Sequence, residues 1–451
     1  MSFTAALCEH VAQTPFAQLP SSTVRKAQVF ILDSLGVAIA GRRGAFRDEL
    51  LGCVQGFGVG ADARVWVTGE ALPAAHAAMV NAYQIHNQEF DCVHESAVVH
   101  PMAVILAALL AHAERDRRVS GQALLLSVVL GVDVAATLGI SARSRLKFFR
   151  PAQCGALGAT AALMRLRGAD AGQIRNALGV CLGQLSGTMQ AHLEGVPLLP
   201  MQIAFNARNA LVSADLAAAG LRGPHDALEG EFGYFKLFES DTELSGLAEA
   251  FGRNWRIEQV SHKPYPSGRA THGGIDALQR LNQQHRLDWR EIAQVTLFAP
   301  PLICQLVDRP VVPHMSANYA KLCFPFVAAR CLLSGYVEID DFAASSLNDR
   351  ATLQLAERIS VVRDQNPDVN ALSPQRLVVE LRSGARFELA IEHVLGSPKN
   401  PLSNSQHLAK FYKNAQAEGI DADSVCAAVD ALANAPTCGA LLDRMCAKTT
   451  R

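Results

Sequence analysis

The 451-residue chain lacks the cysteine patterns of disulfide scaffolds and zinc sites. Its eleven cysteines are scattered, mostly through apolar segments, and no two form a CxxC pair. An odd number of unpatterned cysteines predicts free thiols in a reducing compartment, so we expect a cytoplasmic protein. The closely spaced Cys and His ligands of structural zinc are missing too.

An excess of one charge is also missing. The formal net charge is -1, and no basic tail or stripe is visible, so nucleic acid is not an expected partner. The N-terminal residues lack the basic region and apolar core of a signal peptide, and none is expected. The longest apolar runs are interrupted by His100, His112 and Asp133, which argues against a membrane span.

Two catalytic signatures are absent as well. The G-x-S-x-G elbow of serine hydrolases does not occur, and the run Gly155–Gly158 is a packing motif rather than a phosphate loop. Cys92 stands beside an acid, but a single cysteine in such a place is more often structural than nucleophilic.

The chain is long and 49% hydrophobic, which favours two domains. Apolar residues recur at helical spacing up to about residue 260, and period-two alternation then appears in four short segments. The last segments read as helices again. The sequence therefore predicts a mostly α protein with a smaller α+β domain: a large all-helical domain, residues 1–265 plus 400–451, and an α+β lid, residues 266–399.

The richest polar stretch is 87–101 (NQEFDCVHESAVVHP), which precedes an apolar helix. Asp91 and His100 have strongly apolar neighbours in the sequence. If they are buried, each needs a hydrogen-bonding or charged partner, or has a role in catalysis. His100 precedes Pro101, a residue suited to the first helical turn, and an imidazole there can act as a general base. A solvated turn is an equal interpretation for Glu89 and Glu95. A metal site of Asp91, His94 and His100 is possible, but without an i,i+4 histidine pair we expect none.

A second polar stretch is 262–272 (HKPYPSGRATH). Its prolines make it rigid and extended, and Lys263, Ser267, Arg269 and His272 gather in front of a helix. Cations and hydroxyls before a helix N-terminus suit a carboxylate ligand. The plainer alternative is a linker with stray charges. We expect the two stretches to meet and to form an acid/base site for a small carboxylate.

These motifs resemble the MmgE/PrpD family, which includes 2-methylcitrate dehydratase, cis-aconitate decarboxylase and iminodisuccinate epimerase. The resemblance covers nearly the whole chain and is most specific at Glu89-Phe90-Asp91, His100-Pro101 and the segment 263–277. It implies a homodimer with a helical domain, an α+β lid and a site between them, and no organic cofactor. It also implies that Asp91, His100, Lys263 and His272 are the catalytic residues.

Several family positions differ here. Phe149 stands where the family has a histidine, Leu199 begins the segment where many members carry a Lys-Arg-x-His run, and Phe326 replaces a frequent tyrosine. Arg150 and Arg208 could compensate as substrate-binding cations. His94, Ser267 and Arg269 complete the set expected to bind substrate.

The resemblance implies a cofactor-independent lyase, of the hydro-lyase type, that removes a proton next to a carboxylate. His100 would be the base or the assisting acid, and Asp91 would orient it. With fewer cations than a tricarboxylate needs, 2-methylcitrate itself is not the expected substrate. An epimerase or isomerase of a small dicarboxylate, or a paralogue that only binds a ligand, are the alternatives.

Overall fold

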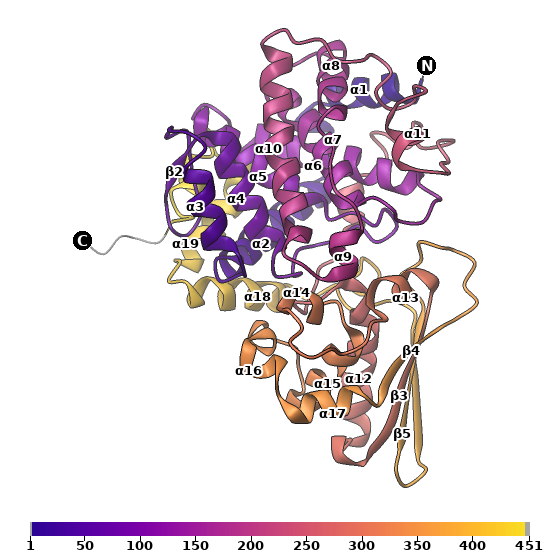
Figure 1. The fold of residues 1–451 in the computed structure, drawn as a ribbon. Helices are drawn as coiled ribbons and strands as arrows, with labels where there is room; N and C mark the ends of the chain where they lie inside the picture. The colour runs from indigo at the N-terminus through magenta and orange to yellow at the C-terminus, as the bar shows by residue number, and fades with distance from the viewer. Residues whose placement is uncertain (1, 447–451) are drawn as a thin grey trace.

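The computed structural model describes residues 2–446, which form a helical part and a smaller part that contains the main sheet (Figure 1). Two separate hydrophobic cores underlie this arrangement. The helical part contains α1 (Phe3–Gln13), α2 (Ser21–Gly41), α3 (Arg47–Gln55), α4 (Ala74–His86), α5 (Pro101–Arg115), α6 (Gly121–Ser141), α7 (Arg150–Leu166), α8 (Ala171–Leu182), α9 (Gln190–Glu194), α10 (Leu198–Ala218) and α11 (Tyr234–Phe238).

Helix α6 lies at the centre of the helical part. It is long and apolar enough to cross a membrane by length and composition, but 89% of its most apolar window is buried inside the protein. It packs closely on α7, because a Cβ atom at Gly158 would lie 2.5 Å from the carbonyl oxygen of Gly131. The Gly-rich run in α7 is therefore a packing motif, as the sequence predicts.

The α+β part is built on a four-stranded sheet of order β4-β3-β5-β6. Strands β3 and β4 are parallel, and the other two pairs are antiparallel. Helices α12 and α15 pack against the sheet, and α17 packs on α15. The elements are α12 (His272–His285), β3 (Ile292–Ala299), α13 (Pro301–Val307), α14 (Ala317–Ala320), α15 (Phe324–Ser334), α16 (Ala344–Leu347), α17 (Arg350–Ala356), β4 (Ile359–Arg363), β5 (Gln375–Leu381) and β6 (Arg386–Ile391).

The C-terminal segment returns to the helical part. Helix α18 (Asn404–Ala417) packs on α2 and lies along the boundary between the two parts in Figure 1. Its Phe411 is buried against Gly36 and belongs to the helical core. The predicted fold class, mostly α with a small sheet, is confirmed at this level, whereas the division at residues 265 and 400 stays a prediction.

Two local predictions are wrong. The first 260 residues are not all helical, because β1 (Ala63–Arg64) and β2 (Ala71–Leu72) form a short antiparallel pair. The apolar spacing in residues 424–445 also predicts one further helix, but the structure has α19 (Ala422–Asp430), a short 3-10 turn and α20 (Gly439–Leu442) there. Pro436 lies in that gap, and proline cannot continue a helix that precedes it.

The contact between α2 and α4 gives a test of the packing that places His86. A Cβ atom at Gly41 would lie 1.8 Å from the carbonyl oxygen of Gln84, which belongs to the last turn of α4. We expect Gly41→Ala to cost roughly 1–3 kcal/mol of stability and to lower the thermal unfolding midpoint. Gly52→Ala is the matched control, because a Cβ there meets nothing within 4 Å. An equal midpoint for both variants would contradict this packing.

Candidate active site

The structure brings the two polar stretches side by side. The backbones of Val93 and Ser261 exchange two hydrogen bonds, of 3.0 and 2.8 Å. Lys263 Nζ lies 3.0 Å from Glu89 Oε2, and Arg269 Nη2 lies 2.8 Å from Glu95 Oε1. The stretches 87–101 and 262–272, some 170 positions apart in the sequence, are therefore in contact, as predicted.

The loop between α4 and α5 holds its acids in a constrained backbone. Glu89 and Val98 both have a φ of 52°, which is uncommon for residues other than glycine. His86 ends α4, and His100 directly precedes α5, whose first residue is Pro101. The loop is buried over most of its length, so its geometry is fixed by surrounding contacts.

Asp91 lies between two imidazoles and is fully buried. His86 Nδ1 is 3.1 and 3.0 Å from its two carboxylate oxygens, and His100 Nδ1 is 3.3 Å from Oδ2. A carboxylate only accepts hydrogen bonds, so His86 Nδ1 carries the proton that faces Asp91. His100 Nδ1 is in ion-pair contact with Asp91 outside hydrogen-bond geometry, and the negative charge beside it favours the tautomer with the proton on Nδ1. This leaves the Nε2 atom of neutral His100 as a free acceptor.

The three groups have shifted pKa values. Burial opposes the charge on Asp91, but the imidazoles of His86 and His100 hold the pKa of its carboxyl well below the ordinary value. Burial also disfavours charge on His86, yet Asp91 and Glu89 raise its pKa. For His100 burial prevails over Asp91, and its pKa is lowered. At neutral pH the cluster therefore contains an ionised Asp91 and a neutral His100, and His86 is the imidazole that the two carboxylates draw toward protonation.

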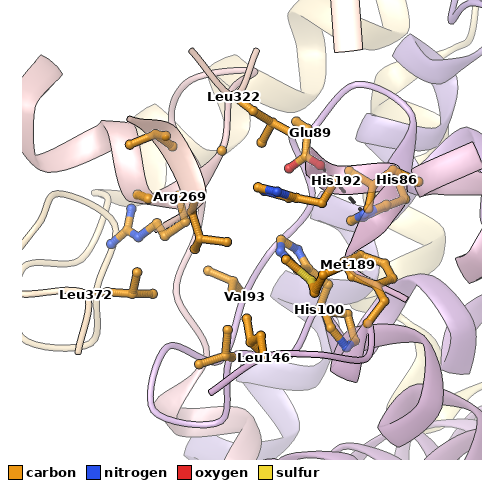
Figure 2. Close-up of a pocket in the computed structure, with 18 residues that line it drawn as sticks. His86, Glu89, Val93, His100, Leu146, Met189, His192, Arg269, Leu322 and Leu372 are labelled. Carbon is orange, nitrogen blue, oxygen red and sulfur yellow. Dashed lines mark ion pairs between the residues drawn. The ribbon is translucent and has the colours of Figure 1, made fainter. Parts of the chain in front are cut away.

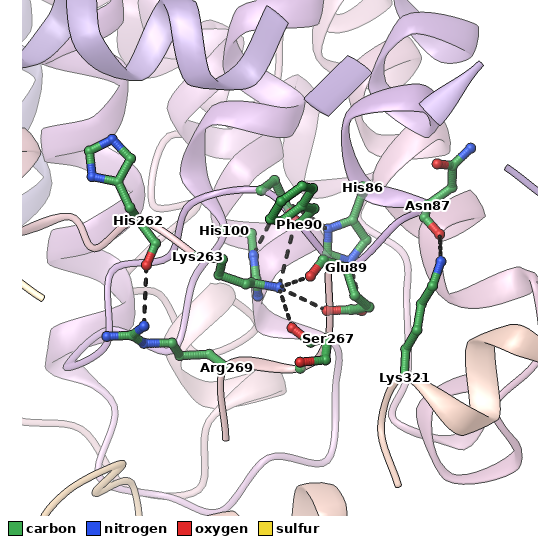
Figure 3. Close-up of polar contacts among 12 residues, drawn as sticks. His86, Asn87, Glu89, Phe90, His100, His262, Lys263, Ser267, Arg269 and Lys321 are labelled. Carbon is green, nitrogen blue, oxygen red and sulfur yellow. Dashed lines mark hydrogen bonds and ion pairs between the residues drawn. The ribbon is translucent and has the colours of Figure 1, made fainter. Parts of the chain in front are cut away.

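Lys263 is fully buried and is held by the acid loop (Figure 3). Its ammonium donates to the carbonyl oxygen of Glu89 at 2.9 Å and to that of Ser267 at 3.5 Å, in addition to the Glu89 carboxylate. Burial would raise the pKa of Glu89, but Lys263 and the two histidines lower it to about 2. Lys321 is buried nearby, donates to Gln88 Oε1 at 2.5 Å, and has its pKa lowered to about 7 by burial.

Arg269, His272 and Ser267 form a second polar group on the other stretch. Arg269 donates to Glu95 and to the carbonyl oxygen of Leu395, at 2.8 Å each. His272 donates from Nε2 to the Ser267 carbonyl at 3.1 Å, and burial together with Arg269 lowers its pKa well below the usual value. These groups already have partners inside the protein.

A pocket opens where the two parts meet. Figure 2 shows His86, Glu89, His100 and His192 on the side of the helical part, and Arg269, Leu322 and Leu372 on the other side. The rest of the wall is almost entirely apolar: Val93, Val98, Leu146, Phe149, Pro151, Met189, Leu199, Gly268, Ala270, Leu306 and Val307. Such a wall excludes water and strengthens the electrostatic interactions within the pocket.

Seven of the nine predicted site residues lie at the pocket or in the polar network and loop beside it. His100 and Arg269 line the pocket, whereas Asp91, Lys263, Ser267 and His272 lie behind its wall in the polar network. His94 lies on the same loop, but its Nδ1 accepts from the Ala97 N–H and its Nε2 faces Gln259, so it supports the loop.

The two arginines expected to compensate for lost cations lie elsewhere. Arg150 is buried and forms a two-pronged ion pair with Glu239, at 2.8 and 3.1 Å, so its charge is used inside the helical part. Arg208 contacts Asn209 and the ring of Phe205. We therefore correct the prediction for Arg150 and Arg208 and leave both out of the proposed substrate site.

Two histidines of the site were missed from the sequence. His86 ends an otherwise ordinary helix, five positions before Asp91. The short separation from Asp91 is the feature of the sequence from which His86 could have been predicted as a site residue. His192 lies in the short helix α9 and reaches the pocket from a segment without any polar cluster of its own.

Two groups of described residues have ligand-type atoms within 4.8 Å of one another: His86, Asp91 and His100, and Asp33, His262 and His407. In the first, both oxygens of Asp91 already lie at hydrogen-bond distance from His86, which fits shared protons. In the second, Lys410 Nζ lies 2.7 Å from Asp33, so a metal ion would face an ammonium group. Neither donor set favours a metal, and the expectation of none stays a prediction.

The Asp91 cluster predicts a stability that depends on pH. The lowered pKa of Asp91 means that its contribution is present above the ordinary value of 3.8 and is lost as the pH falls through the folded value. The raised pKa of His86 means that its contribution is present below 6.5 and is lost as the pH rises through the folded value. We expect Asp91→Asn to cost about 3–5 kcal/mol near pH 5.5 and less at pH 9.

Thermal unfolding at the two pH values measures this difference. Asp276→Asn is the control, because its partner Arg280 is 45% exposed and such a pair contributes less than about 1 kcal/mol. An equal loss for Asp91→Asn at both pH values would contradict the charge assignment.

Comparison with known proteins identifies the family. Residues 5–246 match the model of the MmgE/PrpD N-terminal domain, and residues 265–430 match that of the C-terminal domain. The chain is similar to cis-aconitate decarboxylase of Aspergillus terreus, at 26% identity over 90% of this chain and 88% of the relative. It is also similar to cis-aconitate decarboxylase of Homo sapiens, at 26% identity over 92% of this chain and 88% of the relative. The chain belongs to the MmgE/PrpD family.

Proposed function

We propose that the protein is a lyase that acts on a small carboxylic acid, without an organic cofactor, by removing a proton next to the carboxylate. Family membership and the similarity to decarboxylases support the lyase class. The observation that carries the chemistry is the free Nε2 of His100 at an apolar pocket, with Nδ1 directed at buried Asp91.

His100 acts as the base. Its lowered pKa keeps the imidazole neutral at pH 7, so Nε2 has a lone pair available for the substrate proton. When it takes that proton, the ring becomes positively charged, and the carboxylate of Asp91 stabilises this charge at 3.3 Å. His86 holds Asp91 in place, and Lys263 neutralises the neighbouring Glu89.

The pocket limits the number of carboxylates that a substrate can carry. Lys263 and Arg269 are committed to Glu89, Glu95 and backbone carbonyls. The backbone N–H groups of Arg269 and Ala270, beside the start of α12, have no acceptor within residues 2–446. One substrate carboxylate at this edge, with apolar carbon against Leu146 and Phe149, is the arrangement that we propose. Tricarboxylates such as 2-methylcitrate fit it poorly.

Proton removal is tested by incubating the protein with small hydroxy and unsaturated acids in heavy water. We expect deuterium at the carbon next to the carboxylate, and His100→Gln to lower the exchange rate by about 10²–10⁴-fold. His225→Gln is the control, because the His225 side chain is 74% exposed. Undiminished exchange in His100→Gln would remove His100 as the base.

The same reactions separate the possible outcomes. Loss of water with formation of a double bond identifies a hydro-lyase, and release of carbon dioxide identifies a decarboxylase. Exchange with inversion but without a leaving group identifies the epimerase alternative. An absence of both exchange and product for every acid that shifts the melting temperature would favour a protein that only binds its ligand.

The apolar wall gives a prediction about specificity. Phe149 lines the pocket, and a histidine at this position would add a polar group facing the ligand. We expect Phe149→His to weaken binding of acids with an apolar substituent and to strengthen binding of dicarboxylates of the same length. Isothermal titration with matched pairs of acids measures both changes, and Phe149→Leu controls for the lost ring. A variant with unchanged preference would show that this wall does not contact the substrate.

A further inference from the structure

We propose that His192 is a second catalytic residue, which donates a hydrogen bond from Nε2 to the substrate carboxylate oxygen where negative charge develops. This inference rests on the proposed function, in which His100 removes the neighbouring proton. It assigns a role to a side chain that the two polar stretches of the sequence do not contain.

The position of His192 is the first observation. The residue belongs to α9, lines the same pocket as His100, and is 7% exposed (Figure 2). Its Nδ1 has a partner, whereas its Nε2 has none within residues 2–446, and this atom is not fully buried. The free edge of the ring is thus available to a ligand.

The hydrogen bond at Nδ1 determines the tautomer. Arg309 Nη2 lies 3.2 Å from His192 Nδ1, and Arg309 Nη1 donates to the backbone carbonyl of His192 at 3.2 Å. A guanidinium only donates, so His192 Nδ1 must accept. In the neutral ring the proton is then on Nε2, which makes that atom a donor toward the pocket.

The two histidines are therefore complementary. The carboxylate of Asp91 places the proton of His100 on Nδ1 and leaves Nε2 as an acceptor, while Arg309 imposes the opposite tautomer on His192. The substrate proton goes to His100 Nε2, and the electron pair of the broken C–H bond moves to a carboxylate oxygen. His192 keeps its own proton and stabilises that oxygen by hydrogen bonding.

The charge state of His192 fits this role. Burial, followed by the charge of Arg309, lowers its pKa to about 4, and Glu89 opposes this shift only in part. The imidazole is thus neutral at pH 7. A neutral imidazole that polarises a developing oxyanion is an established catalytic device, which the handling of carbonyl substrates by triosephosphate isomerase illustrates.

The α+β part holds His192 in position. Arg309 follows α13, and its guanidinium stacks on the ring of Tyr319, 4.9 Å from the centroid. Ser316 Oγ donates to the carbonyl oxygen of Gly195 at 2.7 Å, directly after α9. A Cβ atom at Gly195 would lie 2.5 Å from Tyr319 Cα, so the two segments are in close contact. Arg309 is therefore a positioning residue whose effect requires the two parts to be together.

The first experiment needs no substrate. Histidine side chains labelled with ¹⁵N report tautomer and titration by NMR, and His192→Gln identifies the signal. We expect a neutral ring with the proton on Nε2 from pH 8 down to about pH 5. In Arg309→Met we expect a higher pKa and a mixture of tautomers. A proton on Nδ1, or a charged ring at pH 7, would overturn the inference whatever reaction the protein catalyses.

The second experiment measures deuterium exchange on an acid that the wild-type protein accepts. We expect His192→Phe to lose about 10²–10³-fold in kcat, the usual cost of one oxyanion donor. His192→Gln should recover part of this loss, because its amide offers an N–H near the position of Nε2. His225→Gln is the control with an exposed histidine.

The outcomes separate the two proposals. If His192→Phe exchanges as fast as the wild type, the inference is wrong although the proposed function stands. If the NMR result is as expected but no acid is exchanged by the wild type, the proposed function fails and the catalytic role of His192 fails with it. Equal losses in the Phe and Gln variants would show that the ring only supports the fold.

Discussion

One buried carboxylate organises the site. Asp91 has no contact with solvent, and a lone carboxylate there would be protonated or would destabilise the fold. Its two imidazole neighbours, at 3.0 and 3.3 Å, keep it ionised. In return, Asp91 makes these imidazoles differ, because it raises the pKa of His86 whereas burial prevails at His100 and lowers its pKa. The base of the proposed reaction thus depends on a second histidine, His86, which holds the carboxylate that orients it.

A second constraint is the pairing of charges between the two stretches. Glu89 forms an ion pair with Lys263, and Glu95 forms one with Arg269. These buried ion pairs hold the two polar stretches together in a defined geometry. Buried pairs contribute little net stability compared with apolar packing, but loss of one partner is costly. Lys263 and Arg269, which the sequence suggested as ligand-binding cations, therefore neutralise carboxylates of the protein itself. This explains why the pocket wall is apolar and why one carboxylate is a better match than three.

The sequence predicted the parts of the site that are local in the chain. Asp91 with His100, and Lys263 with Arg269 and His272, could be found because polar residues cluster within each stretch and prolines mark its backbone. The elements with long periodic patterns, such as α6 and the strands around Gly384, were also predictable. Arg150 and Arg208 were placed wrongly, because nothing in the local pattern reveals that Glu239 or Asn209 is the nearer partner. His86 and His192 were missed because each stands alone in an ordinary helix, and only tertiary packing brings it to the pocket.

The replaced family positions acquire a physical meaning from His192. Phe149 and Leu199 line the pocket, at positions where the resemblance noted from the sequence implies a histidine and a basic segment, so this part of its wall is apolar. The pocket still contains a hydrogen-bond donor, the imidazole of His192. It comes from α9, and Arg309 fixes its tautomer. A neutral donor stabilises a developing charge without attracting the additional carboxylates that a lysine would bind. A neutral imidazole in place of a cation would thus still support proton abstraction by His100, with Asp91 behind it. It would also restrict the substrates to acids with few carboxylates, which fits the apolar wall of the pocket.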